Sequence, residues 1–279
     1  MSIAPHRQYA IVTGAASGIG RELSLQLAGP EWHLALVDHN AAGLQATLAA
    51  VKEAGGSGQC ETFDVADANA WRALFQKLSA EWPALDLLCN NAGVCGAGEV
   101  GKFALDDWHW LLGINLLGPI HACHVLLEWL KQNPRGGHIL NTASLAGLIS
   151  IPGMAAYNVS KAGLVALSET MYSELRRFNV GVTVLCPGFV ATDLVKTGRF
   201  ENDDLRREAQ AFMDRGQVTA AQVAIAALHA VRRKRLYVVL GWKARLLWRL
   251  KRLAPRFMHR LIARIHARRS AVGEQHVGR

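Results

Sequence analysis

Residues 9–20 read Tyr-Ala-Ile-Val-Thr-Gly-Ala-Ala-Ser-Gly-Ile-Gly, an apolar run that enters a Gly-x-x-x-Gly-x-Gly loop. Gly14 permits a tight turn, Gly18 lets the backbone approach a pyrophosphate, and Gly20 allows a helix to pack closely on a strand. The helix that follows the loop would present its N-terminus to phosphate charge. Glycine-rich turns also occur for packing alone, but this stretch predicts the first strand, loop and helix of a nucleotide-binding α/β sheet.

The rest of the chain repeats this alternation of short apolar runs and longer amphipathic segments. The runs expected as strands are Tyr9–Thr13, His33–Val37, Gln59–Phe63, Leu85–Cys89, His138–Asn141, Val180–Cys186 and Leu236–Leu240. The segments expected as helices are Arg21–Leu27, Ala42–Glu53, Asn69–Glu81, Trp108–Gln132, Ala155–Phe178 and Ala220–Arg232. Such alternation implies right-handed crossovers between parallel strands. The sequence therefore predicts an α/β fold with a single Rossmann-type, doubly wound parallel sheet of about seven strands and helices on both faces.

Composition fits one globular domain rather than a disordered or fibrous chain. Of the 279 residues, 51% are apolar and 19% are charged, and no low-complexity linker or repeat divides the chain. The five scattered cysteines lack zinc-site spacing and disulfide-scaffold density, which predicts no metal site and a reducing, cytoplasmic location. We expect no secretory signal, because the first apolar run begins by about Tyr9 with no charged segment and long hydrophobic stretch of the kind a signal has. We expect no membrane span, because the longest segment without Asp, Glu, Lys or Arg, 136–160, is broken by Gly, Pro, Asn and Ser.

The net charge of +9 is concentrated in the last quarter of the chain. Residues 1–214 hold 15 Lys and Arg against 21 Asp and Glu, whereas residues 215–279 hold 16 against the single acid Glu274. From Trp242 onward, Leu246, Leu250, Leu253, Phe257, Leu261 and Ile265 recur at helical spacing among Arg245, Arg249, Arg252, Arg256, Arg260, Arg264 and Arg268. This pattern predicts a nucleotide-binding domain over 1–241 and a basic amphipathic helical extension over 242–279, broken at Pro255.

The extension has two interpretations that the sequence leaves open. Its apolar side packs on the body or on a partner subunit, or residues 242–269 lie in an anionic membrane interface. Nucleic acid is not expected as a partner, because no recognised binding module accompanies the charge.

Polar residues at the ends of the predicted strands complete a nucleotide cradle. Asp38 lies twenty residues after Gly18, where a carboxylate can accept both hydroxyls of an adenosine ribose and repel a 2′-phosphate. The glycine loop holds no arginine, so NAD is favoured over NADP, although Arg21 and His39 leave NADP open. The other candidates, each also compatible with an ordinary turn, are Asp64, Val65, Asn91, Ala92 and Gly93.

A proton-transfer pair stands on the second long helix. Tyr157 and Lys161 are four residues apart, on one side of the helix, and an ammonium near a phenol favours the phenolate and lowers its pKa. Ser144 follows the fifth predicted strand, where its hydroxyl can bond a substrate oxygen or cap a helix. Taken singly, each of these residues also fits a structural role.

Together these residues resemble the short-chain dehydrogenase/reductase family from about residue 8 to residue 240. The agreement in order and spacing covers the glycine loop, Asp64, Asn90–Gly93, Asn115, Ser144, the Tyr157/Lys161 pair, and Pro187-Gly188 with Thr192. The resemblance implies an NAD(P)-dependent enzyme acting on CH–OH groups. It also implies a homo-oligomer, a dimer or a tetramer, built from the long helices near 108–132 and 155–178.

The resemblance also implies a role for each site residue. Tyr157 would be the general acid in carbonyl reduction and the base in alcohol oxidation, and Ser144 would hold the reacting oxygen. Lys161 would bind nicotinamide-ribose hydroxyls and tune Tyr157, while Asn115 would support a water in a proton relay. The residues implied to bind the cofactor are Gly14, Ser17, Gly18, Ile19, Gly20, Asp38, Asp64, Val65, Asn91, Ala92, Gly93, Tyr157, Lys161, Pro187, Gly188, Val190 and Thr192.

Few charges surround the expected reaction centre. The apolar candidates for its wall are Val94, Leu145, Leu148, Ile149, Ile151, Met154 and Phe189, which equally fit core or subunit contacts. Residues 193–215 are expected to form a polar lid with Phe200, Leu205 and Phe212 turned inward. The favoured function is an NAD(H)-dependent dehydrogenase for a lipophilic secondary alcohol or ketone, steroid-like, retinoid-like or long-chain. The alternatives are an NADP(H)-dependent carbonyl reductase and a non-catalytic dinucleotide-binding scaffold that uses the basic tail.

Overall fold

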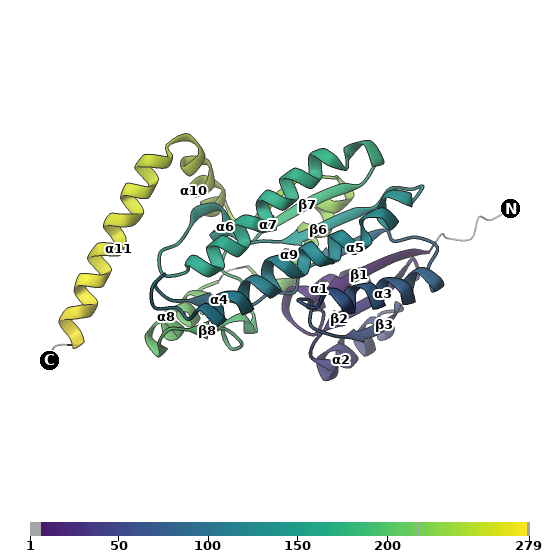
Figure 1. Ribbon diagram of the computed structural model, residues 1–279, viewed down its shortest axis with the longest axis horizontal. Helices are drawn as coiled ribbons and strands as arrows, with labels where there is room; N and C mark the ends of the chain where they lie inside the picture. The colour runs from purple at the N-terminus through teal and green to yellow at the C-terminus, as the bar shows by residue number, and fades with distance from the viewer. Residues whose placement is uncertain (1–6, 217, 278–279) are drawn as a thin grey trace.

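Seven parallel strands form the central sheet of the computed structural model, which describes residues 7–216 and 218–277 and side chains as far as residue 268. The sequence predicts a domain over 1–241 and an extension over 242–279. Residues 1–6 of that domain, residue 217 within it, and residues 278–279 of the extension lie outside the described residues. The strand order is β3-β2-β1-β4-β6-β7-β9 (Figure 1). The strands are β1 (Gln8–Thr13), β2 (Trp32–Asp38), β3 (Ser57–Thr62), β4 (Leu87–Asn90), β6 (His138–Thr142), β7 (Gly181–Cys186) and β9 (Tyr237–Val239). The expected doubly wound sheet is confirmed.

The strand order reverses between β1 and β4, which are neighbours in the sheet. The register pairs Thr13 with Val37 on one side of β1 and Val12 with Cys89 on the other. In sheets of this kind a ligand crevice opens beyond the carboxyl ends of the strands at the reversal point. The glycine loop after β1 and the turn after β4 therefore meet at this edge.

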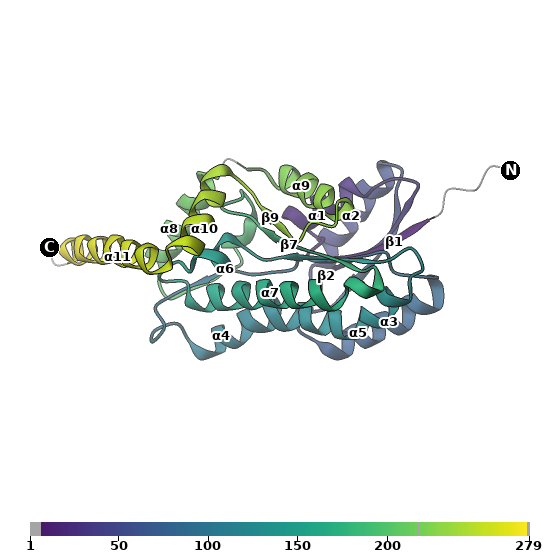
Figure 2. The same ribbon diagram turned by 90° about the horizontal axis from the view of Figure 1, so that it is seen from above.

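Helices cover both faces of the sheet, as Figure 2 shows from above. One face carries α1 (Gly18–Gln26), α2 (Ala41–Glu53) and α9 (Ala220–Arg232), whose buried residues include Leu23, Leu44 and Val223. The other face carries α3 (Ala68–Glu81), α5 (Gly118–Gln132) and α7 (Ala155–Glu174), the last followed by the short η2 (Arg176–Phe178). The sheet interior is buried on both faces, which explains the continuous apolar character of the central strands.

The first long helix predicted from the sequence consists of three segments. They are α4 (Leu105–Leu112), a π-helical turn η1 (Gly113–Leu117) and α5. The whole run Leu105–Gln132 is long and apolar enough to cross a membrane, which corrects the expectation that no stretch qualifies. In this fold the run packs against α3 and α7, and Leu111, Leu126 and Leu130 are buried in the protein. These three leucines therefore belong to the core of this fold.

Several short elements around the crevice were not expected. A two-stranded sheet joins β5 (Gly96–Ala97) to β8 (Arg199–Phe200), and α6 (Leu145–Ile149) begins directly after Ser144. The segment expected as a lid contains η3 (Asp193–Val195), β8 and α8 (Asp203–Asp214). Phe212 stacks on Phe189 with ring centres 5.1 Å apart, and Met213 is the residue of α8 that is buried.

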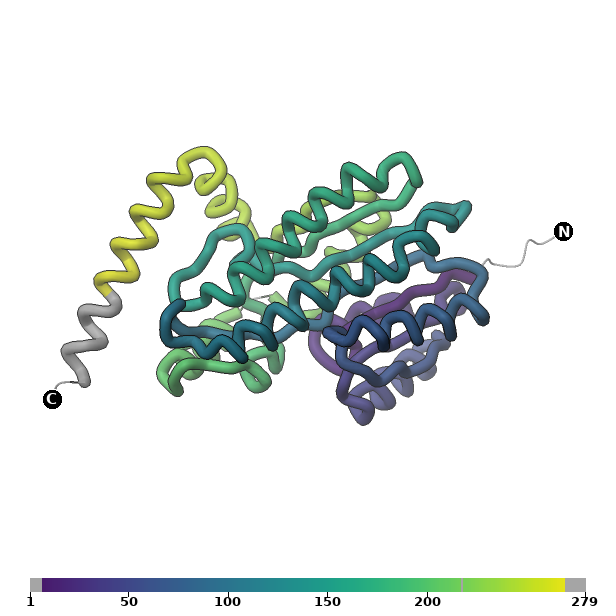
Figure 3. The backbone as a smooth tube through the Cα atoms, in the orientation of Figure 1, coloured from purple at the N-terminus to yellow at the C-terminus, as the bar shows by residue number. Residues whose placement is uncertain are grey.

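The C-terminal extension forms a pair of helices, α10 (Trp242–Leu253) and α11 (Pro255–Val277), at one end of the molecule. The predicted break at Pro255 is confirmed. Figure 3 follows the chain from the sheet into α10, which lies against α6, and then into α11, which extends away from the sheet. Lys251 Nζ donates a hydrogen bond of 2.7 Å to the Leu148 carbonyl of α6.

Candidate active site and nucleotide cradle

The glycine loop has a backbone that side chains would obstruct. Gly14 and Gly18 have φ angles of 65° and 52°, in the left-handed region. A Cβ atom on Gly14 would lie 2.9 Å from Ala92 Cα, and one on Gly20 would lie 2.0 Å from the Gly14 carbonyl oxygen. Ser17, the N-cap residue of α1, makes no side-chain hydrogen bond to that helix. The first N–H groups of α1 thus remain available to an anion, which fits the pyrophosphate of a dinucleotide.

Thr13 joins the glycine loop to the turn after β4. Its Oγ1 accepts hydrogen bonds of 2.9 Å from the backbone N–H groups of Asn91 and Ala92. Asn91 Nδ2 in turn donates to the Thr13 carbonyl at 3.1 Å, and Asn91 Oδ1 accepts from the Thr142 hydroxyl at 3.2 Å. Gly93, two residues after Asn91, is packed so closely that a Cβ there would lie 3.1 Å from Asn115 Oδ1. This turn therefore joins the glycine loop to the residues around Asn115 and Thr142.

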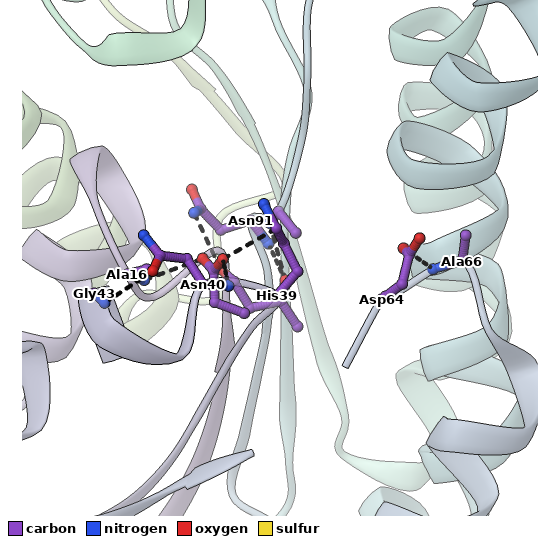
Figure 4. A network of polar contacts seen from close by, with 10 residues as sticks. Ala16, His39, Asn40, Gly43, Asp64, Ala66 and Asn91 are labelled. Atoms are coloured by element: carbon purple, nitrogen blue, oxygen red, sulfur yellow. Dashed lines mark hydrogen bonds and ion pairs between the residues drawn. The ribbon is translucent and has the colours of Figure 1, made fainter. Parts of the chain in front are cut away.

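Asp38 ends β2 and organises the turn beside the glycine loop. Its Oδ2 accepts from the Ala16 N–H at 3.1 Å, and its Oδ1 accepts from the Asn40 N–H at 3.0 Å. The imidazole of His39 lies 3.2 Å from Oδ1 and is largely exposed. Figure 4 shows Ala16, His39 and Asn40 gathered at this turn. The carboxylate is thus held at the edge of the crevice, beside the glycine loop.

Asp64 occupies a different part of the crevice. Its Oδ1 accepts a hydrogen bond of 2.9 Å from the Ala66 N–H, a short-range turn contact, and Val65 beside it is buried. In Figure 4 the pair of Asp64 and Ala66 lies apart from the group around His39 and Asn40. The two predicted acids therefore line separate sections of the site.

The loop after β7 forms the far wall of the crevice. The Pro187 carbonyl accepts a hydrogen bond of 2.8 Å from the Leu145 N–H, and Gly188 has open space where a Cβ would lie. Val190 is buried, whereas Thr192 lies so near the glycine loop that its Cγ2 is 3.3 Å from where a Gly18 Cβ would be. An open cleft of about 380 Å³ at this point is lined by Gly18, Ala191, Thr192, Asp193, Lys196, Gln210, Met213 and Asp214.

Tyr157 and Ser144 are joined by a side-chain hydrogen bond at the starts of α7 and α6. Tyr157 lies in the first turn of α7 and is 8% exposed, while Ser144 is the N-cap of α6 and accepts from the Ala146 N–H at 3.1 Å. Burial raises the pKa of Tyr157 to about 12, and a hydrogen bond with the Ser144 hydroxyl opposes part of that rise. The sequence led us to expect a lowered pKa, and in the chain itself the cost of burying a phenolate is the larger effect.

Lys161 is buried one helical turn after Tyr157. Its Nζ donates to the Thr142 carbonyl at 2.9 Å and lies 5.8 Å from the centre of the Tyr157 ring. Burial lowers the pKa of Lys161 to about 8. Among the described residues Thr142 is the acceptor that the structure gives to this ammonium, which has three protons to donate.

Asn115 lies in the π-helical turn and is fully buried. Its Oδ1 accepts from the Val94 N–H at 2.8 Å, and its Nδ2 donates to the Val94 carbonyl at 2.8 Å and to Ser160 Oγ at 3.2 Å. π-Helical turns are rare and cluster at functional sites. In this structure the amide positions the start of the loop that follows Gly93.

The apolar residues expected at the reaction centre fall into two groups. Val94, Ile151 and Met154 pack in the cluster that contains Tyr157, together with Phe103, Leu111, Val195, Met213 and other apolar residues. Leu145, Leu148 and Ile149 instead pack in a separate cluster that contains Trp248 of the extension. Phe189 is 44% exposed and stacks on Phe212. The wall beside Tyr157 is thus apolar, but fewer residues than expected contribute to it.

Three residues with a clear place in the site were not predicted. Thr13 and Thr142 end β1 and β6, and Ser160 joins Asn115 to α7 through hydrogen bonds. A polar residue as the last position of a buried strand was a usable signal for both threonines. Ser160 carried no such signal, because its role depends on the helix that packs opposite it.

Comparison with known proteins places this geometry in context. A family model described as short chain dehydrogenase matches residues 8–203. The chain is 34% identical over 189 residues to "Probable oxidoreductase EphD" of Mycobacterium tuberculosis, a match that spans 68% of this chain but only 32% of that protein. It is 32% identical over 201 residues to "3beta-hydroxysteroid dehydrogenase" of Mediterraneibacter gnavus, spanning 72% of this chain and 71% of that one. The crystal structure of a short chain dehydrogenase/reductase from Burkholderia phymatum in complex with NAD has a TM-score of 0.83 and 31% identity, covering 89% of this chain and 94% of that chain.

Proposed function

The chain belongs to the short-chain dehydrogenase family, and from this premise we propose that it transfers a hydride between NAD(H) and a lipophilic secondary alcohol or its ketone. The observation that carries the proposal is the convergence of Tyr157, Ser144 and Lys161 at the edge of the crevice that also holds the glycine loop. A phenol in contact with a serine hydroxyl, with a buried ammonium close by, is suited to proton transfer at a carbonyl oxygen.

The chain's own residues supply orientation and proton transfer. The nicotinamide, when bound, supplies or accepts the hydride. In reduction Tyr157 gives its proton to the carbonyl oxygen, and in oxidation it takes the proton of the alcohol. Ser144 donates a hydrogen bond to the same oxygen, and Lys161 holds ribose hydroxyls beside Tyr157. The pKa of Tyr157, raised to about 12, keeps its proton in place at neutral pH, which is the form that reduction requires.

Asp38 supports NAD as the preferred cofactor. Its carboxylate is fixed by the backbone of Ala16 and Asn40, where it would bond ribose hydroxyls and repel a 2′-phosphate. Arg21, the nearest arginine in sequence to the loop, pairs with Glu22 at 3.5 Å. An NADP(H)-dependent carbonyl reductase remains the second candidate, because His39 beside Asp38 would add positive charge when protonated.

The apolar cluster at Tyr157 supports a lipophilic substrate. Val94, Ile151, Met154 and Met213 pack in the same apolar cluster as Tyr157. An apolar wall favours steroid-like, retinoid-like or long-chain alcohols and ketones over sugars and hydroxy acids. A relative with the name 3beta-hydroxysteroid dehydrogenase points in the same direction.

We place catalysis in residues 1–241 and treat 242–279 as an extension. The proposed assembly is a homo-oligomer, a dimer or a tetramer. The proposed location is the cytoplasm, with peripheral membrane contact through residues 242–269 and no nucleic-acid partner.

The decisive experiment compares the unaltered protein with Tyr157→Phe. Both are titrated with NADH and NADPH by fluorescence, and both are assayed with a panel of lipophilic ketones. We expect tighter NADH than NADPH binding in both proteins and a loss of turnover of at least ~1,000-fold in Tyr157→Phe. Cofactor binding without turnover of any ketone or alcohol by the unaltered protein would instead favour the non-catalytic scaffold.

A further inference from the structure

The helices α10 and α11 carry two parallel rows of side chains. One row is apolar and the other is arginine, and both advance mostly by four residues, which is the spacing of neighbours along a helix surface. The apolar row is Trp242, Leu246, Leu250, Leu253, Phe257, Leu261 and Ile265, and the arginine row is Arg245, Arg249, Arg252, Arg256, Arg260, Arg264 and Arg268. From Leu246 onward, each apolar residue of the row directly follows an arginine. The two rows thus run side by side along both helices.

The apolar row is not the side that packs on the body. The least exposed residues of the extension belong to other positions: Ala244 and Met258 are buried, and Trp248, Lys251, Ala254 and Ile262 are half-buried. Trp248 and Ile262 pack in the cluster of Leu148 and Ile149, and Lys251 bonds the Leu148 carbonyl. All seven members of the apolar row are instead exposed, from 41% for Leu250 to 84% for Leu253. This excludes the interpretation in which the body covers the row. An exposed apolar stripe of this length marks an interaction surface.

The charge beside the row is one-sided. Residues 242–268 contain nine Lys and Arg and no Asp or Glu. Within the described part of the chain, none of the ion pairs includes an arginine of α10 or α11. The surface therefore combines exposed apolar side chains with arginines for which the structure gives no ion pair among the described residues.

We propose that α10 and α11 form a docking surface for an anionic lipid bilayer. Side chains such as Phe257 and Leu261 would enter the acyl boundary, while the adjacent arginines would reach the lipid phosphates. A second copy of the chain fits less well, because two such surfaces would bring like charges together. Nucleic acid would use the cations but leave the apolar row exposed to water.

The position of α10 and α11 determines which side of the protein would face the bilayer. Figures 1 and 2 both show α10 and α11 at the end of the molecule that also carries α6 and α8. Lys251 fastens α10 to α6, the helix that Ser144 caps. Docking would therefore turn the substrate side of the crevice toward the lipid, a consequence that rests on the proposed function, whereas lipid binding itself does not.

The test is co-sedimentation of the full chain with vesicles of phosphatidylcholine alone or mixed with phosphatidylglycerol. Arg256→Gln/Arg260→Gln/Arg264→Gln removes three charges from the surface, and Phe257→Ser/Leu261→Ser/Ile265→Ser removes part of the apolar row. The matched control Arg72→Gln/Arg176→Gln/Arg233→Gln removes three charges from the body. We expect binding to the mixed vesicles only, a loss of at least tenfold in the first two variants, and none in the control.

Three outcomes would overturn the proposal. They are vesicle binding that does not depend on phosphatidylglycerol, an equal loss of vesicle binding in the body control, and undiminished vesicle binding by the apolar-row variant. A change of molecular mass in solution caused by the apolar-row variant, without vesicle binding by the unaltered protein, would assign the surface to a second copy. Tyr157→Phe should bind vesicles like the unaltered protein, so a failure of the proposed chemistry is distinguishable from a failure of docking.

Discussion

Asn115 holds Val94 by both of its backbone polar groups: Oδ1 accepts from the Val94 N–H and Nδ2 donates to the Val94 carbonyl, each at 2.8 Å. This pair of bonds fixes the chain just after Gly93, between the nucleotide cradle and the apolar wall. The remaining Nδ2 proton reaches Ser160 on α7. One amide therefore ties together three parts of the site.

Asn115→Leu should destabilise the protein by ~2–4 kcal/mol, because leucine is close in size but leaves both Val94 backbone groups without a partner and removes one of the two hydrogen bonds of the Ser160 hydroxyl. Urea denaturation gives the free energy of unfolding. Asn69→Leu, on the exposed start of α3, is the control and should change stability by less than ~0.5 kcal/mol. Equal small effects at the two positions would show that the Asn115 bonds are dispensable.

Gly20→Ala should disrupt the glycine loop. The added Cβ would lie 2.0 Å from the Gly14 carbonyl oxygen, so the backbone must move, with a cost of ~2 kcal/mol or more and at least tenfold weaker dinucleotide binding. Gly29→Ala is the matched control, since a Cβ there has no heavy atom within 4 Å. Thermal melts and NADH titration of both variants test this, and a Gly20→Ala protein that matches Gly29→Ala in both assays contradicts it.

Lys161→Met should stabilise the protein while abolishing turnover. The pKa of Lys161 is about 8 in the folded chain and about 10.5 in the unfolded chain, so the unfolded state binds the proton more tightly. The resulting destabilisation is absent above about pH 10.5, grows as the pH falls to 8, and is constant below. After allowance for the lost bond to Thr142, a net gain of ~2 kcal/mol is expected at pH 7. Urea denaturation at pH 7 and pH 10 checks this, and a variant less stable than the unaltered protein at pH 7 would refute it.

Asp38→Asn should change the cofactor preference. The amide keeps an acceptor near Ala16 but removes the negative charge that repels a 2′-phosphate. The ratio of the NADPH and NADH dissociation constants should move toward NADPH by at least tenfold, or ~1.4 kcal/mol. Fluorescence titration measures the ratio. An unchanged ratio would mean that Asp38 only stabilises its own turn.

Lys251→Met should lower kcat/KM for a lipophilic ketone several-fold. The ammonium caps the C-terminal end of α6 through the Leu148 carbonyl, and α6 begins at Ser144. We expect Lys251→Met to lower kcat more than it raises KM, and we expect Lys251→Arg to restore kcat, because arginine can also donate to the Leu148 carbonyl. Lys243→Met, on the exposed side of the same helix, is the control. Identical kinetics for the two methionine variants would separate the extension from the active site.

The sheet was predictable because buried parallel strands are apolar throughout and their helices are amphipathic. The seven strands lie within a few residues of the expected ranges. The short β5, β8 and α6 were missed, because two to five residues carry no period. The interruption of the first long helix at Gly113–Leu117 was missed for another reason: the π-helical turn carries Asn115, whose bonds to Val94 join residues 21 positions apart, and no local pattern signals such a pair.

At the site, the motif residues could be identified, but their energetics could not. The sequence predicts a lowered pKa for Tyr157 from the nearby Lys161. It does not predict that burial raises the pKa of Tyr157 and lowers that of Lys161, since burial depends on packing from Val94, Met213 and other remote residues. For the same reason Leu145, Leu148 and Ile149 were assigned to the wall of the crevice, although they pack against the extension.

The extension follows β9, the last strand and an edge of the sheet. A segment that follows an edge strand is joined to the sheet at one point of the chain. Among the described residues, no strand comes after α10 and α11. Removing α10 and α11 would therefore leave the order of the seven strands unchanged, but it would uncover the part of α6 that Trp248 and Lys251 contact. Fusing residues 242–277 behind the final strand of another sheet with this strand order would show how much of the behaviour of the helix pair travels with it.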